Sequence, residues 1–226
     1  MCIRDRSWGP LVQTWAAERQ ARAAVFSVSG CPPLLGIRSP LHAHCELADD
    51  VWKERLITEL RPSLIVLTAR WGAYVNEPPP GYRGLAHRMT AAEDEPPTLA
   101  SSRDAIALRL PATLERLTQI APVIVVLAPP DLVRNPFAAL PRQLEFRPTL
   151  EAHREAQRLV EEVVRKAAAG NPRIAFLDPA ETLCAGPRCE AILGEVLVYQ
   201  DDNHVSAQGA LLFREAFARA VRALGL

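Results

Sequence analysis

The chain has 226 residues, 49% of them hydrophobic and 23% charged, which is the composition of a folded globular protein with one large domain or two small ones. Lys and Arg number 26, as do Asp and Glu, so the formal net charge is zero. This balance argues against a general nucleic-acid binder, which needs a net basic surface. The sequence has no run of about 18 apolar residues, so we expect no membrane span in it.

Helix-like and strand-like patterns alternate along the first half of the chain. Apolar residues at a spacing of three and four predict helices, short continuous apolar runs predict buried strands, and Pro-rich stretches predict loops. In chain order the expected elements are a helix over 8–20, a strand over 22–29, a helix over 49–60, a strand over 63–68 and a long loop over 76–97.

The second half continues this alternation. The expected elements are a helix over 102–120 capped by Ser102, a strand over 123–127, a Pro-rich loop over 129–148, a helix over 149–169 capped by Thr149, a strand over 173–177, a strand-like stretch over 196–198 and a closing helix over 207–224. Alternating helices and apolar strands predict a parallel sheet with helices on both faces. The predicted fold class is therefore a three-layer α/β/α domain.

The most informative segment covers residues 199–206, YQDDNHVS, between the last strand-like stretch and the closing helix. A histidine in such a loop acts as a general base when a carboxylate fixes its tautomer. Asp201 precedes His204 by three residues, so a single turn can bring the two side chains together. The alternative interpretation is a polar loop that caps the closing helix through Asn203 or Ser206.

This segment resembles the last motif block of the SGNH hydrolase superfamily. The resemblance is closer to the periplasmic SGNH domains attached to membrane-bound O-acyltransferases of the acyltransferase-three type. Supporting motifs are SGCPP at 29–33, Ala69-Arg70-Trp71 after an expected strand, and the two cysteines at 184 and 189. The resemblance implies a flavodoxin-like parallel sheet and acyl-transfer chemistry.

The resemblance also implies roles for individual residues. His204 would take a proton from a serine nucleophile, and Asp201 would orient His204. Gly30 would donate its N–H to the oxyanion, or it is a turn glycine with positive φ. Arg70 would contact an anionic sugar or the oxyanion, in the region where the superfamily has an asparagine. Trp71 would stack on a sugar ring, or it packs in the core.

The start of the chain departs from the family pattern. The first motif block, Gly-Asp-Ser-His, belongs a few residues before Trp8, where the sequence reads MCIRDR. We therefore expect residues 1–7 to be a non-native leader and residues 8–226 to form the SGNH-like domain, truncated at its N-terminus, without its first strand and nucleophile. Ser7 lacks the Gly-Asp context and lies close to Trp8, so we do not expect it to be the nucleophile, and we expect the chain as written to be inactive.

The resemblance further implies two disulfides, Cys31–Cys45 and Cys184–Cys189, as expected of a protein from an oxidising compartment. His42, His44 and Cys45 suggest a metal, but a zinc site needs three or four ligands and no second cluster matches, so we expect no metal. The sequence has no glycine-rich phosphate loop, and we expect no cofactor.

The expected function is O-acyl transfer, for example of acetyl, to a periplasmic or cell-surface glycan. An upstream transmembrane acyltransferase domain would supply the acyl group and tether this domain to the inner membrane. Two alternatives remain open: a secreted carbohydrate esterase of the same fold, and a non-catalytic glycan-binding domain. The upstream gene would discriminate among the three.

Overall fold

A computed structural model describes residues 6–28, 30–41, 45, 58–78, 86–92 and 95–226. Its strands are β1 (Ile65–Thr68), β2 (Val123–Val126), β3 (Ile174–Leu177), β4 (Ile192–Leu193) and β5 (Val196–Leu197). Its helices are η1 (Arg6–Trp8), α1 (Gly9–Ala17), α3 (Gly72–Val75), α4 (Leu99–Thr118), α5 (Pro136–Ala139), η3 (Leu140–Arg142), α6 (Leu150–Gly170), α7 (Ala180–Leu183), α8 (Ala207–Leu211) and α9 (Arg214–Ala223). None of the helices in the described part of the chain is long and apolar enough to cross a membrane.

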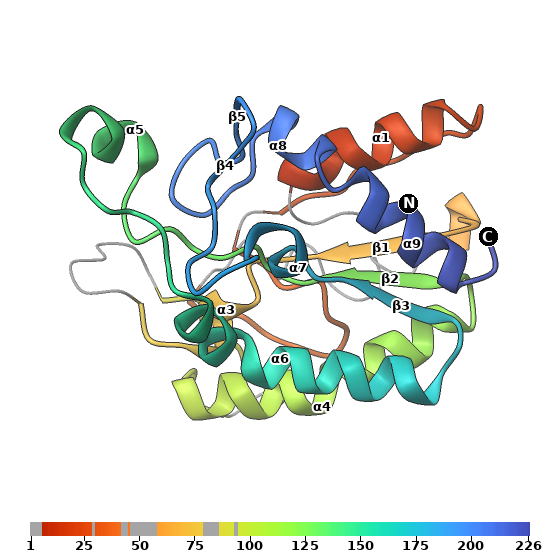
Figure 1. The fold of residues 1–226 in the computed structure, drawn as a ribbon. Helices are drawn as coiled ribbons and strands as arrows, with labels where there is room; N and C mark the ends of the chain where they lie inside the picture. The colour runs from red at the N-terminus through yellow and green to blue at the C-terminus, as the bar shows by residue number, and fades with distance from the viewer. Residues whose placement is uncertain (1–5, 29, 42–44, 46–57, 79–85, 93–94) are drawn as a thin grey trace.

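The centre of the molecule is a parallel sheet in the order β1-β2-β3, and helices cover both of its faces (Figure 1). Alternate side chains of the strands feed two separate cores. Val66, Ile124 and Val126 pack with α1 and α9 on one face, whereas Ile65, Val123 and Val125 pack with α4 and α6 on the other. Burial on both faces explains why these strands are continuously apolar. The expected three-layer α/β/α fold is confirmed.

Side-chain caps determine where the helices start. Thr149 accepts a hydrogen bond from the Ala152 N–H at 3.1 Å and caps α6 as expected. Helix α4 starts earlier than expected, because Thr98 and Ser101 form a reciprocal capping box. The expected cap, Ser102, is instead buried inside the helix, where its hydroxyl accepts a hydrogen bond from the Met89 N–H at 2.9 Å.

Three sequence expectations need correction. Residues 22–28 form no strand, because β1 is the outermost strand of the described sheet and nothing pairs with its free side. Residues 196–197 pair antiparallel with β4 in a separate hairpin, outside the parallel sheet. The closing helix is divided into α8 and α9, because Leu212 and Phe213 make tighter i→i−3 backbone bonds that direct Phe213 into the core. The helix expected over 49–60 lies largely outside the described residues.

Candidate acyl-transfer site

The loop after β5 holds Asp201 and His204 in one tight turn. One carboxylate oxygen of Asp201 accepts the backbone N–H groups of Asn203, at 2.9 Å, and His204, at 2.7 Å. The other oxygen lies 2.8 Å from Nδ1 of the His204 imidazole. The Gln200 N–H closes the turn on the His204 carbonyl at 2.9 Å. The carboxylate therefore shapes the loop with one oxygen and orients the imidazole with the other.

The hydrogen bonds to Asp201 keep it ionised. Partial burial acts to raise the pKa of the Asp201 carboxyl, but the two backbone N–H groups and the His204 side chain outweigh it, so the pKa lies below its usual range. A permanent negative charge beside Nδ1 holds the tautomer in which Nε2 accepts a proton, and it stabilises the imidazolium once it forms. This arrangement suits a general base.

Asp201 and His204 line a cleft of about 810 Å³ at the carboxyl end of the parallel strands. Ser7, Gly30 and Arg70 line the same cleft. The structure thus brings five of the residues named from the sequence to one place. A site is expected at this edge of the sheet, because the loops that follow parallel strands meet there.

Ser7 and Trp8 go to different places although they are neighbours in the chain. Trp8 is buried in the core, edge-to-face with Phe213 at a ring-centroid distance of 5.0 Å. Ser7 lies directly before α1 and contributes to the wall of the cleft. The proximity to Trp8 that argued against Ser7 in the sequence therefore does not keep it from the site.

Gly30 has φ of +72° and lies in the cleft wall. The two interpretations left open by the sequence, turn glycine and oxyanion donor, are compatible at this position. Trp71 is different: its side chain is fully buried, and its Nε1 donates to the Val126 carbonyl at 2.9 Å. Stacking on a sugar is not available to a side chain in this position, and core packing is the interpretation that the structure supports.

Arg70 carries a carboxylate partner that the sequence interpretation missed. Its Nη2 donates to Oδ2 of Asp131 at 2.8 Å, and its Nε lies 3.3 and 3.2 Å from the two carboxylate oxygens. Arg70 follows β1 and Asp131 follows β2, and these strands are neighbours. The available signal for this partner is the carboxylate of Asp131, which follows two prolines directly after an apolar strand. The sequence pattern predicts only a Pro-rich loop over 129–148.

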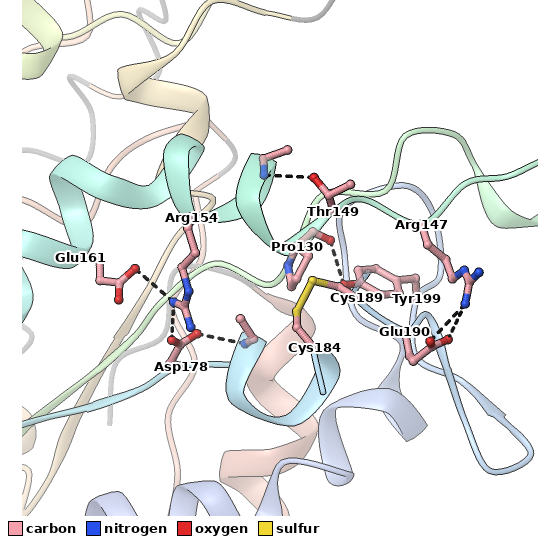
Figure 2. The surroundings of a disulfide bond; sticks show 12 residues. Pro130, Arg147, Thr149, Arg154, Glu161, Asp178, Cys184, Cys189, Glu190 and Tyr199 are labelled. Carbon is pink, nitrogen blue, oxygen red and sulfur yellow. Dashed lines mark hydrogen bonds and ion pairs between the residues drawn. A yellow bond between two sulfur atoms is a disulfide. The ribbon is translucent and has the colours of Figure 1, made fainter. Parts of the chain in front are cut away.

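Both expected disulfides are present, and Figure 2 shows the surroundings of one of them. Cys184 and Cys189 are bonded as expected, and so are Cys31 and Cys45, the former of which lines the cleft. Beside the Cys184–Cys189 bond, Arg147 pairs with Glu190 at 3.0 Å, and the Tyr199 hydroxyl donates to the Pro130 carbonyl at 2.8 Å. Disulfides are typical of extracytoplasmic proteins.

Three further polar residues lie outside the Asp201–His204 loop: Asp178, His153 and His87. Asp178 accepts the Ala180 N–H and pairs with Arg154 at 2.6 Å, away from the cleft. His153 is buried, and His87 lines the cleft edge-to-face with Tyr74. Across the described ranges, no three His, Cys, Asp or Glu side chains gather as a metal site; His42 and His44 lie outside those ranges.

Comparison with known proteins gives one family and a common fold. Among curated proteins, no sequence matches this chain. Two solved structures share its fold. The periplasmic domain of the lipopolysaccharide acetyltransferase of Salmonella ser. Paratyphi A is 13% identical, with a TM-score of 0.61 over 97% of this chain and 82% of that one. The acetyl xylan esterase AlAXEase is 10% identical, with a TM-score of 0.56 over 98% of this chain and all of that one.

A family model described as the SGNH domain fused to AT3 domains matches residues 6–219, so it includes Ser7, Arg70 and the Asp201–His204 loop. The match covers nearly the whole described chain, and the family and the fold agree. The chain belongs to the enzyme family of SGNH domains that are fused to AT3 domains.

Proposed function

We propose that this chain is the acyl-transfer domain of a membrane O-acyltransferase and that it moves an acetyl group to a hydroxyl of a glycan outside the cytoplasm. The observation that carries the proposal is the 2.8 Å contact between Asp201 and Nδ1 of His204 in a cleft that Ser7 also lines. The AT3 domains to which members of this family are fused are the proposed source of the acyl group, which is consistent with the family match.

Ser7 is the proposed nucleophile, a change from the expectation that the chain lacks one. Its hydroxyl attacks the acyl carbonyl while Nε2 of His204 takes its proton. The leaving oxygen then receives that proton, and an acyl-serine remains. A glycan hydroxyl attacks the acyl-serine, gives its proton to His204 and leaves with the acyl group, and Ser7 regains its proton.

Two further residues are proposed to stabilise the negative oxygen that forms in each attack. Gly30 offers a backbone N–H in the cleft wall, and Arg70 offers a guanidinium at the end of β1. Such donors are worth about 10²–10³ in turnover each when they are aimed at the oxyanion. Arg70 would then take the role of the asparagine that is absent here.

The test is hydrolysis of 4-nitrophenyl acetate, with and without a glycan acceptor whose acetylation is followed by mass spectrometry. We expect Ser7→Ala and His204→Ala each to lower kcat by at least about 10³-fold, and Asp201→Asn by about 10²–10⁴-fold. Ser63→Ala, an exposed serine at the opposite end of β1, is the control that should retain full turnover.

The outcomes separate the alternatives. Activity in Ser7→Ala that His204→Ala abolishes would remove Ser7 from the mechanism but keep the base. Hydrolysis that produces free acetate, with no acetylated glycan, would favour the esterase. Wild-type turnover no higher than that of His204→Ala would favour a glycan-binding domain and would agree with the sequence-based expectation of an inactive chain.

A further inference from the structure

Arg70 lines the cleft, and it forms an ion pair with Asp131 that the proposed chemistry does not use. Asp131 engages the guanidinium through both of its carboxylate oxygens, at 2.8 to 3.3 Å. Both side chains keep access to solvent, with exposed fractions of 32% for Arg70 and 43% for Asp131. Ion pairs this exposed contribute only about 0–1 kcal/mol to stability. Stability alone therefore does not account for the pair.

The backbone around Asp131 is attached to the loop that carries the catalytic pair. On one side of Asp131, the Pro130 carbonyl accepts the Tyr199 hydroxyl at 2.8 Å (Figure 2). On the other side, the Leu132 N–H donates to the Asp202 carbonyl at 2.7 Å. Burial raises the pKa of Tyr199, so its phenol stays protonated and remains a donor. The two neighbours of Asp131 in the chain thus form one hydrogen bond each with Tyr199 and Asp202.

These contacts connect three segments that are distant in the sequence. The end of β1 carries Arg70, the segment after β2 carries Asp131, and the loop after β5 carries His204. A free arginine side chain samples many rotamers, and a carboxylate that engages its planar head restricts it to one orientation. A guanidinium fixed in this way keeps one orientation in the cleft that His204 also lines.

We propose that Asp131 is a positioning residue for acyl transfer: it holds the Arg70 guanidinium aimed at the carbonyl oxygen of the acyl ester, beside His204. This inference rests on the proposed function and adds the residue that makes Arg70 effective as an oxyanion donor. Since the benefit of such a donor depends on alignment, it appears in kcat, and KM changes little.

The experiment compares 4-nitrophenyl acetate hydrolysis by the wild-type chain, Asp131→Asn, Asp131→Glu and Arg70→Gln. Asp131→Asn keeps the shape but loses the charge, and we expect kcat to fall about 10- to 100-fold with KM within about threefold. Asp131→Glu restores the carboxylate and should recover part of kcat. The double variant Arg70→Gln with Asp131→Asn should be no slower than Arg70→Gln alone, because the two residues act as one unit.

The matched control is Glu145→Gln. Glu145 also engages an arginine with both oxygens, at 3.2 Å to Nε and 3.2 Å to Nη2 of Arg147, and it lies in the same connection between β2 and α6. Its partner Arg147 does not line the cleft, whereas Arg70 does. We expect this variant to keep wild-type kcat. Thermal unfolding of every variant shows whether a loss of kcat exceeds the loss of folded protein.

The results distinguish the inference from the proposal beneath it. Turnover that depends on His204 but is unchanged within twofold in Asp131→Asn overturns the positioning role alone. The positioning role is also overturned if the losses of kcat in the two single variants multiply in the double variant. A loss of kcat that unfolding explains overturns it as well. Wild-type turnover at the His204→Ala level overturns the proposed function and this inference together.

Discussion

At the scale of single residues, burial and local hydrogen bonding decide how each ionisable group behaves. Asp201 and His153 show the two extremes. Hydrogen bonds from its own loop outweigh desolvation at Asp201 and keep it charged at the cleft. His153, on the inner side of α6, is only 5% exposed, and there desolvation dominates.

His153 predicts a pH dependence of stability. Burial lowers the pKa of His153 from 6.5 to about 4, although nearby Asp178 and Glu161 oppose this effect and Arg154 reinforces it. Between these pH values the unfolded chain binds a proton that the folded chain excludes. The free energy of unfolding is therefore unaffected by this group above pH 6.5 and falls as the pH drops toward 4, by about 3 kcal/mol in total.

Urea unfolding at pH 7 and pH 4.5 measures this loss, and His153→Gln, which cannot titrate, provides the comparison. The variant should lose about 2–3 kcal/mol less than the wild type between the two pH values. Equal losses in both proteins would show that His153 accepts its proton without unfolding.

At the scale of elements, close packing of α8 against the segment after β5 sets the position of the loop that carries Asp201 and His204. Ser206 caps α8 by accepting the Gly209 N–H at 2.9 Å, and the Ser206 N–H donates to the Val198 carbonyl at 2.7 Å. A Cβ at Gly209 would collide with the Val198 backbone. Glycine at this position therefore permits the contact that brings the two ends of the 199–205 loop together.

Gly209→Ala should force α8 away from Val198 and lower the free energy of unfolding by about 1–3 kcal/mol or more. Because His204 lies between the two displaced elements, turnover should fall as well. Gly170→Ala, at the end of α6 with open space around its Cβ, is the matched control and should be neutral. Urea unfolding and ester hydrolysis together test this; equal behaviour of the two variants would contradict the packing argument.

Element boundaries also show what a local pattern predicts. Continuous apolar runs predicted all three strands of the parallel sheet, because burial on both faces leaves no alternation. The same type of pattern did not form a strand over the described residues 22–28, since a strand needs a neighbour to bond with and the described residues supply none beside β1. Helix starts were recovered where the cap is unambiguous, at Thr149, and displaced where several hydroxyls compete, at 98–102.

At the scale of the whole molecule, two disulfides close segments of different length, and Cys31 of the longer one lines the cleft. Cys31–Cys45 closes a segment with a sequence separation of 14, and Cys184–Cys189 one of only 5. In the chain-entropy account a longer loop gives more stabilisation, about 3 kcal/mol for the first and about 2 kcal/mol for the second.

We therefore expect Cys31→Ala with Cys45→Ala to destabilise the protein more than Cys184→Ala with Cys189→Ala. Urea unfolding measures both, and a reducing agent should weaken the wild type further while leaving a variant without both bonds unchanged. Free thiols at all four positions in non-reducing peptide maps, after expression in an oxidising compartment, would contradict both the pairing and the extracytoplasmic location.

The sequence by itself determined the features that depend on neighbours in the chain. Three residues separate Asp201 from His204, so one turn suffices to join them, and the apolar runs of the parallel strands require burial whatever surrounds them. The fold class, the family and the base of the proposed mechanism follow from such local patterns.

Only the tertiary structure decided which side chains share the cleft. Trp71 follows Arg70 directly, yet the backbone turns one side chain into the core and the other toward the site. In the same way, Ser7 lines the cleft whereas the side chain of Trp8 packs in the core. Asp131 reaches Arg70 across 61 positions of sequence because β1 and β2 are neighbours in the sheet, and the order of strands is set by long-range packing that no local pattern records.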